Sequence, residues 1–331
     1  MVQNGIGLSA GVGNGSGRSD LLVYIPTYNR PNSLRRQLAA LAEQRSDWPG
    51  TVRILISDNA SSASSDDELQ SLALEYSVEV RRNAGNIGGN ANIALGFVFT
   101  RVDEYLWILS DNDTIGPSAL RYIAEHGLSG GADAIVFSTK LEQPSEFIHT
   151  WDKAWEGVGE NGLISNVIYR SSVFLPHASE AFFYHNTSFP HVCVQLATLR
   201  ERNTLRYRAL PRSSVFAPGL PHGEHPGDYR LSFTGMPQLL PLLPQRQAQM
   251  FARTWLRDQG REFFRQRDSF PGVHLSSTAS IRRYGGFRAR AIMRILAIRH
   301  ALVGRFDAAA AALVRRLVPE RIKRSIRSHR S

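Results

Sequence analysis

The segment YLWILSDNDTIGP, residues 105–117, places a short apolar run directly before Asp111, Asn112 and Asp113. A short, largely apolar run of this kind is typical of a buried β-strand. Two interpretations of its acidic end are open. Asp and Asn favour turns because their side chains bond to the nearby backbone, but carboxylates also hold divalent cations together with phosphate oxygens. The remainder of the chain must distinguish an acidic turn from a cation site.

Predicted strands and helices alternate from residue 21 to residue 138. Each strand is a short apolar or β-branched run, and the helices between them carry leucines at helical spacing. The predicted strands are 21–25, 51–57, 78–82, 105–109 and 132–138. This alternation predicts an α/β fold, in which a mostly parallel sheet is flanked by helices.

Polar clusters follow the ends of four of these strands. In sheets of this class, ligands bind beyond the carboxyl ends of the strands. The clusters comprise residues 26–30, 58–59, 83–90 and 111–113. Four polar loops at one edge of a sheet favour a binding site over an isolated acidic turn.

Composition changes along the chain suggest its domain organisation. Periodicity weakens after residue 140, apart from an apolar segment at 162–170 and a predicted helix at 191–202, and a helical, Arg-rich pattern begins near residue 245. We expect a flexible Gly-rich leader (1–19), a domain with two halves (about 20–140 and 141–240) and a helical basic C-terminal region (241–331).

The bulk composition is that of a globular protein, with 42% hydrophobic and 21% charged residues. No apolar run is long enough to span a bilayer, no secretory signal pattern is recognised, and Cys193 is the only cysteine. A cytoplasmic location is therefore expected.

The net charge of +10 is concentrated at one end of the sequence. Residues 281–331 contain 14 Lys and Arg and only two acidic residues, which leaves 25 basic and 27 acidic side chains in residues 1–280. The slightly acidic body argues against the alternative of a basic nucleic-acid or partner-binding protein without catalysis, which needs its charge on the folded surface.

Four ordered motifs carry a resemblance to a known family. IPTYNRPNSLRRQLAAL, ILISDNASS, NAGNIGGNANIALGF and WILSDNDTIGP resemble the nucleotide-sugar domain of family 2 glycosyltransferases with the GT-A (Rossmann-like) fold. GLISNVIYRSSVF and SFPHVCVQLATL resemble an abequosyltransferase-like subgroup of O-antigen synthesis. The resemblance covers roughly residues 21–205. A sugar-nucleotide pyrophosphorylase is the alternative, but it needs a G-x-G-T-R-type loop where this chain has PTYNR.

The resemblance implies roles for individual residues. It assigns Asp113 of the D-x-D motif to a cation, Mn²⁺ or Mg²⁺, and Asp111 to the nucleotide. It also places a further set of residues at the nucleotide-sugar site: Pro26, Thr27, Asn29, Arg30, Asp58, Asn86 and Asn90. A hard cation suits this chemistry, because negative charge builds on the β-phosphate as the sugar leaves.

The resemblance also implies a catalytic base, which accepts the proton of the acceptor hydroxyl. Many relatives carry an acidic pair at the start of the helix that follows the acceptor segment, whereas this chain reads Pro190-His191 there. His191 can serve, since an unperturbed imidazole titrates near neutrality. A buried His bonded to the backbone is the other interpretation, and Glu180, Asp152 and His185 are further candidates.

The basic C-terminal region repeats an amphipathic, Arg-rich helical pattern. Such helices can lie on an anionic membrane surface, although packing of the apolar stripe on the protein is equally consistent with the pattern. Together these patterns predict a metal-dependent inverting hexosyltransferase. Its expected partners are a nucleotide-sugar donor and a saccharide acceptor, which we expect to be lipid-linked at the cytoplasmic face of the inner membrane.

Overall fold

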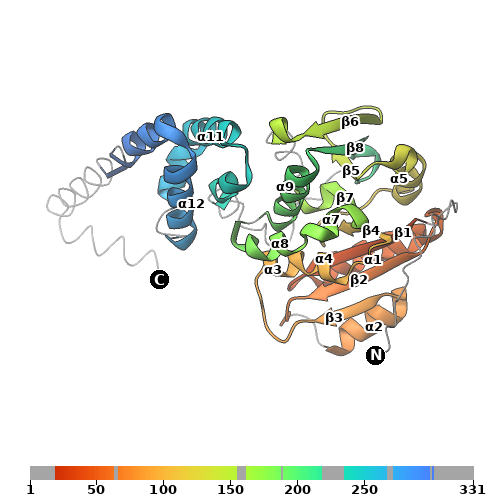
Figure 1. Cartoon of the computed structure of the whole chain (residues 1–331). Helices are drawn as coiled ribbons and strands as arrows, with labels where there is room; N and C mark the ends of the chain where they lie inside the picture. The colour runs from red at the N-terminus through yellow and green to blue at the C-terminus, as the bar shows by residue number, and fades with distance from the viewer. Residues whose placement is uncertain are drawn as a thin grey trace, which may run out of the picture.

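The computed structural model describes residues 19–62, 66–154, 162–187, 189–217, 235–266, 271–298 and 300–301. Residues 1–18 of the expected leader and the basic segment 302–331 lie outside the described residues. An eight-stranded sheet forms the centre of the described part, with the strand order β3-β2-β1-β4-β7-β5-β8-β6 (Figure 1). The sheet is flanked by helices, which confirms the predicted fold class.

The first half of the sheet is parallel, as predicted. The paired strands are β1 (Asp20–Thr27), β2 (Val52–Asp58), β3 (Glu79–Arg82) and β4 (Glu104–Ile108). The helices between them are α1 (Pro31–Gln44), α2 (Asp66–Tyr76), α3 (Gly89–Ala94) and α4 (Gly96–Phe99). All four carboxyl ends therefore lie at one edge of the sheet.

The second half of the sheet mixes directions. It contains β5 (Ala134–Ser138), β6 (Ser145–Thr150), β7 (Val167–Arg170) and β8 (Thr204–Pro211). Strand β7 lies antiparallel between β4 and β5, β8 is parallel to β5, and β6 is antiparallel to β8. Strands β4, β5 and β8 thus point the same way, and the loops after β5 and β8 lie at the same edge as those of the first half.

Longer and shorter helices complete the described chain. The α-helices are α5 (Ala119–Gly127), α7 (Ser171–Phe174), α8 (Ser179–Phe183), α9 (Pro190–Arg202), α11 (Gln245–Arg265) and α12 (Pro271–Tyr284), and residues 286–298 are also helical. The 3-10 turns are η1 (Arg45–Asp47), η2 (Ser129–Gly131), η3 (Trp151–Lys153), η4 (Ile164–Asn166), η5 (Leu175–His177), η6 (His185–Thr187), η7 (Arg212–Ser214) and η8 (Met236–Leu242).

Both faces of the central strands are buried, whereas the edge strands β3 and β6 are largely exposed. Along β1, Leu22 and Tyr24 point into one apolar cluster, while Leu21, Val23 and Ile25 point into the other. This alternation follows from the two-residue period of a strand, and a strand buried on both faces reads as a continuous apolar run. The run LLVYI is such a strand.

The C-terminal helices belong to the same apolar core as α9. Leu239, Leu256, Phe263 and Ile281 lie in the cluster that also contains residues of α9. The side-chain amide of Gln247 donates to the carbonyl of Trp151 at 3.1 Å, which adds a polar contact between α11 and the first 200 residues. Within the described part of the chain, no helix has both the length and the hydropathy needed to cross a bilayer.

A buried ion pair ties together the amino-terminal ends of the strands. Arg53 donates to both carboxylate oxygens of Glu104, from Nε at 3.0 Å and from Nη2 at 3.1 Å, and the backbone N–H of Arg101 donates to the same carboxylate at 2.8 Å. Glu104 is buried. Burial by itself raises the pKa of Glu104, but the bonds from Arg53 and Arg101 outweigh it and hold the pKa below its ordinary value of 4.5.

We predict that Glu104→Gln destabilises the protein in a pH-dependent way. A lowered carboxyl pKa contributes stability above the unfolded-state pKa, and this contribution is lost as the pH falls through the folded-state value. Urea denaturation at pH 7 should show a loss of about 3 kcal/mol, and the difference from the wild type should shrink below pH 4.5. The control is Glu75→Gln, which breaks the exposed Arg35–Glu75 pair and should cost less than about 1 kcal/mol. A loss of unfolding free energy in Glu104→Gln that does not change with pH would contradict the lowered pKa of the Glu104 carboxyl group.

Candidate active site

The loop after β4 is fixed by the segment that precedes β7. The indole N–H of Trp107 donates to the carbonyl of Ser165 at 2.9 Å, and the backbone N–H of Ser110 donates to the Ser165 hydroxyl, also at 2.9 Å. Because β7 runs antiparallel to β4, its start lies beside the end of β4. These two bonds therefore fix the direction in which residues 110–113 leave the sheet.

Asp111 links the ends of β4 and β1. One of its carboxylate oxygens accepts from the Thr27 hydroxyl at 2.8 Å, and the other accepts from Nη1 of Arg30 at 2.8 Å. Asp111 is almost completely buried, and this burial raises its pKa although Arg30 and Thr27 act in the opposite direction. Asp111 therefore bonds within the protein and fixes the P-T-Y-N-R loop against the D-N-D segment.

Asp113 lies on the more open side of the same segment. Its Oδ1 accepts from Nη2 of Arg212 at 3.1 Å, and its side chain keeps 29% of its surface exposed. Arg212 also donates to the side-chain oxygen of Asn166 and lies 4.0 Å from the centre of the Phe216 ring. Arg212 follows β8, so a cation from the second half of the sheet faces the carboxylate from the first half. The sequence patterns do not single out Arg212, because they do not indicate a strand at the position of β8.

The arrangement around Asp113 fits a cation that takes most of its ligands from a substrate. Among the described residues, no group of three or more His, Cys, Asp or Glu side chains can hold a metal ion. Mg²⁺ is commonly bound through one or two carboxylates together with substrate phosphates and water. The partly exposed Asp113 carboxylate suits this mode, whereas both oxygens of the buried Asp111 already accept hydrogen bonds from protein groups.

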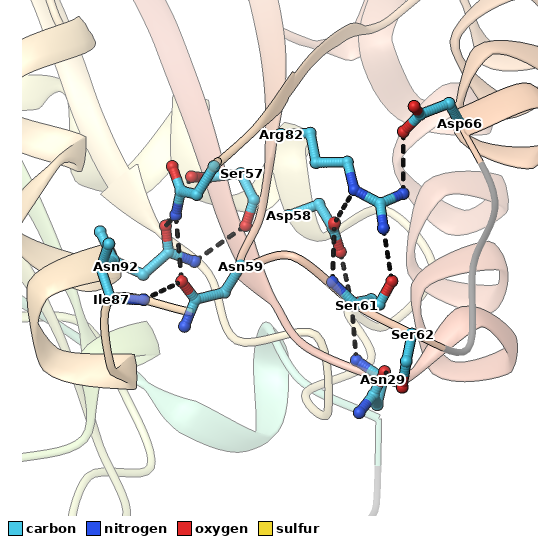
Figure 2. Close-up of polar contacts among 11 residues, drawn as sticks. Asn29, Ser57, Asp58, Asn59, Ser61, Ser62, Asp66, Arg82, Ile87 and Asn92 are labelled. Atoms are coloured by element: carbon cyan, nitrogen blue, oxygen red, sulfur yellow. Dashed lines mark hydrogen bonds and ion pairs between the residues drawn. The ribbon is translucent and has the colours of Figure 1, made fainter. Parts of the chain in front are cut away.

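Asp58 organises the loop after β2 from a fully buried position (Figure 2). Its carboxylate accepts from the backbone N–H of Ser61 at 3.0 Å and from the Ser61 hydroxyl, and Nε of Arg82 lies 3.5 Å away. The Ser61 hydroxyl in turn accepts from the backbone N–H of Asn29 at 2.8 Å. Asn29 has a φ of 56°, a left-handed conformation that Asn tolerates better than most residues. Asp58 and Asn29 are thus joined through Ser61.

Amide side chains connect the Asn- and Gly-rich loop to the same edge (Figure 2). The Asn59 side chain donates to Asn86 at 2.8 Å and accepts from Asn83 at 3.1 Å and from the backbone N–H of Ile87 at 3.0 Å. Asn92, within α3, accepts from Asn83 at 3.1 Å and donates to the carbonyl of Ser57 at 2.8 Å. This Asn network holds the loop between β3 and α3.

The structure brings the predicted site residues to one edge of the sheet, but with unequal exposure. Thr27, Asp58 and Asp111 are buried. Pro26, Asn29, Arg30 and Asn90 are half-buried, and Asn86 is exposed. Tyr28, which the patterns left without a role, is 43% exposed in the middle of the P-T-Y-N loop. The residues able to meet a ligand are thus the less buried ones, while the buried carboxylates position them.

Helix α9 carries His191 and Cys193 in fully buried positions near its start. Burial raises the pKa of the Cys193 thiol to about 12. The first ten residues of α9 are buried on every side of the helix, so contact between His191 and an acceptor hydroxyl requires the segment around α9 to shift. Of the other candidates for the base, His185 is exposed and bonds to the carbonyl of Phe182 at 2.6 Å.

A protein-family sequence model matches most of the segments that form this edge and its loops. Residues 22–186 match the model of glycosyl transferase family 2, a span that includes strands β1 to β7 and the D-x-D segment. This region is a glycosyltransferase domain. Strand β8 and Arg212 lie beyond the matched span.

Similar solved structures include complexes with nucleotide sugars. S. aureus TarS 1-349 in complex with UDP-GlcNAc has 13% identity and a TM-score of 0.46, covering 83% of this chain and 90% of that one. A mannosyltransferase from Pyrobaculum calidifontis in complex with GDP-Man and Mn²⁺ has 12% identity and a TM-score of 0.45, covering 90% and 81%. Glucosyl-3-phosphoglycerate synthase from Mycobacterium tuberculosis in complex with Mn²⁺ and UDP-Glc has 13% identity and a TM-score of 0.45, covering 69% and 79%. No curated protein sequence matches the chain.

We predict that Asp111→Asn destabilises the glycosyltransferase domain by about 3 kcal/mol, because it leaves Arg30 beside a neutral, buried amide. Chemical denaturation monitored by tryptophan fluorescence measures this loss. Asp103→Asn, in an exposed turn before β4, is the control and should stay within about 0.5 kcal/mol of the wild type. Equal stability of the two variants would show that Asp111 does not hold the two loops together.

Proposed function

We propose that the protein is a metal-dependent inverting glycosyltransferase that transfers a hexose or deoxyhexose from a nucleoside-diphosphate donor to a saccharide acceptor. The observation that carries the proposal is the pairing of Asp113 with Arg212 at the carboxyl edge of the sheet. A partly exposed carboxylate beside an Arg provides one group for a cation and one for phosphate oxygens. Both lie next to the loops of a glycosyltransferase domain.

The nucleoside part of the donor is proposed to contact the loops after β1, β2 and β3. Tyr28 offers an exposed ring for the base, and Pro26, Asn29, Asn86 and Asn90 supply the partly exposed surroundings. Asp58, Thr27 and Asp111 act as positioning residues, because their side chains are buried and bonded to these loops. Arg30 can both position the loop and contact the donor, since it is paired with Asp111 and its side chain remains partly exposed.

The reaction forms a bond between the acceptor oxygen and the anomeric carbon and breaks the bond from that carbon to the diphosphate. The diphosphate leaves with the electron pair, and the acceptor proton passes to a base. Mn²⁺ or Mg²⁺ held by Asp113 would supply Lewis-acid stabilisation of the leaving diphosphate. Arg212 faces the same position and can bond to phosphate oxygens as the sugar departs.

The acceptor is proposed to be lipid-linked, as in O-antigen-like surface polysaccharide synthesis with an abequosyltransferase-like enzyme. The sequence motifs at 162–174 and 188–199 support this subgroup, and the basic C-terminal region supports peripheral association with the cytoplasmic face of a membrane.

We predict that one nucleotide sugar stabilises the protein against thermal unfolding in a metal-dependent manner. UDP-, GDP-, CDP- and dTDP-sugars are to be compared with Mn²⁺ and with EDTA, since a ligand that binds only the folded state raises Tm. Asp113→Asn should abolish the Mn²⁺-dependent part of the shift and lower kcat about 1,000-fold, while the unliganded Tm is unchanged.

The matched control is Asn112→Ala, which alters the exposed residue between the two aspartates and should keep the shift and the activity. A Tm shift or turnover that is equal with EDTA and with Mn²⁺ would refute the role of Asp113 in metal binding.

We predict that His191→Gln lowers kcat by about 100-fold or more and removes the acidic limb of the pH–rate profile, if the imidazole accepts the acceptor proton. His177→Gln is the control, because the His177 ring contacts Glu201 near the C-terminal end of α9. Because His191 is buried, Tm is measured for both variants to separate misfolding from chemistry. A folded His191→Gln protein with normal kcat would exclude this residue as the base.

A further inference from the structure

The C-terminal helices form a pocket that is open to solvent on one side and shares no lining residue with the glycosyltransferase edge. The pocket has a volume of about 480 Å³ and lies between α11, α12 and the helix at 286–298. Phe264, Met293 and Ala297 form its apolar part. This volume is within the usual range of small-molecule sites. The pocket can therefore hold a ligand with an apolar portion.

Three arginines line the same pocket. Arg282 comes from α12, and Arg290 and Arg294 come from the helix at 286–298. Among the described residues, none of the three pairs with a carboxylate, and no Asp or Glu lines the pocket. All three side chains are exposed at the rim of the pocket and make it positively charged, and Arg is the side chain best suited to bind phosphate oxygens.

A hydroxyl group adds a further polar feature to the wall. The Oγ1 atom of Thr278 is buried and has no hydrogen-bond partner within the described chain. Buried hydroxyls are normally satisfied, so this atom suits a ligand oxygen. Close by, the His274 ring stacks on Phe263 with 4.1 Å between ring centres, which stiffens the α11–α12 contact.

Large apolar side chains are exposed on the helix that carries two of the arginines. Phe287, Ile295 and Ile298 are 78%, 58% and 60% exposed. Phe287, Arg290, Arg294 and Ile298 are spaced three or four residues apart, so they share one face of the helix. Arginines beside exposed apolar residues are typical of a helix that lies at the boundary between headgroups and acyl chains.

We propose that this pocket binds a phosphate group attached to an apolar chain, with the phosphate between Arg282, Arg290 and Arg294 and the start of the chain against Phe264 and Met293. The inference deepens the proposed membrane association by naming the chemical group that is recognised. Anionic phospholipids and lipid-linked phosphates both carry this group, whereas free phosphate lacks the chain.

The first test uses flotation of the full-length protein with vesicles of phosphatidylcholine alone or with 30% phosphatidylglycerol. The wild type should bind the anionic vesicles, and Arg290→Gln/Arg294→Gln should weaken this partition about 20-fold. Arg253→Gln/Arg288→Gln removes the same charge from exposed positions that do not line the pocket, and it should weaken binding much less. Equal losses of vesicle binding in both double variants would overturn the proposal, because they would show that overall positive charge, and not the pocket, accounts for the binding.

The second test distinguishes binding in the pocket from binding to a membrane and from binding at the donor site. Farnesyl phosphate, inorganic phosphate and farnesol are titrated calorimetrically with EDTA present, which removes metal-dependent donor-site binding. We expect farnesyl phosphate to bind at least tenfold more tightly than either fragment, and Arg290→Gln/Arg294→Gln to lose this preference. Binding of farnesyl phosphate without vesicle binding would retain the pocket and reject the membrane role. Equal binding of phosphate and farnesyl phosphate, or wild-type affinity in the double variant, would overturn the pocket.

Discussion

The contact between Arg30 and Asp111 is the constraint on which the candidate active site depends. Parallel strands end together, so their loops crowd at one edge and place polar groups where water reaches them poorly. A carboxylate buried there is costly unless it is bonded, and Asp111 is bonded to both Thr27 and Arg30. These contacts settle the relative position of the loops after β1 and β4, and the more exposed Asp113 is oriented as a consequence.

In the neighbouring loops, the buried polar groups are bonded mainly to neutral amide side chains. Asn59 and Asn92 both donate and accept, and Asn83 donates to each of them, so the three connect β2, β3 and α3 without adding charge. A site for a nucleoside diphosphate gains from this choice, because extra carboxylates in the loops would repel the ligand. Formal charge is instead concentrated at Asp58 with Arg82, at Asp111 with Arg30, and at Asp113 with Arg212.

The sequence predicted the first half of the sheet well because each strand there is a continuous apolar run between Gly-, Asn- or Pro-containing loops. It did not predict β6 and β8. The residues Leu205 and Tyr207 of β8 do alternate with Arg206 and Arg208, but the surrounding segment is rich in aromatic residues and Pro, which hides this period.

Burial was the property of the site that the sequence could not predict. The positions of Asp58, Asp111 and His191 at strand or helix ends are readable from spacing. Whether a carboxylate meets a ligand or supports a loop depends on partners that come from distant parts of the chain, such as Arg82 for Asp58 and Arg212 for Asp113. The side chains that the motifs singled out include several that are enclosed by protein, while Tyr28 and Arg212 keep part of their surface exposed.

The burial of Cys193 has a practical consequence. Its thiol is fully enclosed in α9, and burial raises its pKa to about 12, so the reactive thiolate is scarce at neutral pH. Since no other cysteine occurs in the sequence, the folded surface is free of native reactive thiols. A single cysteine introduced at an exposed position such as Ser62 would therefore be the sole site of rapid labelling. Fluorescent or spin probes can then follow the loops of the candidate site in a protein whose own cysteine is left in place.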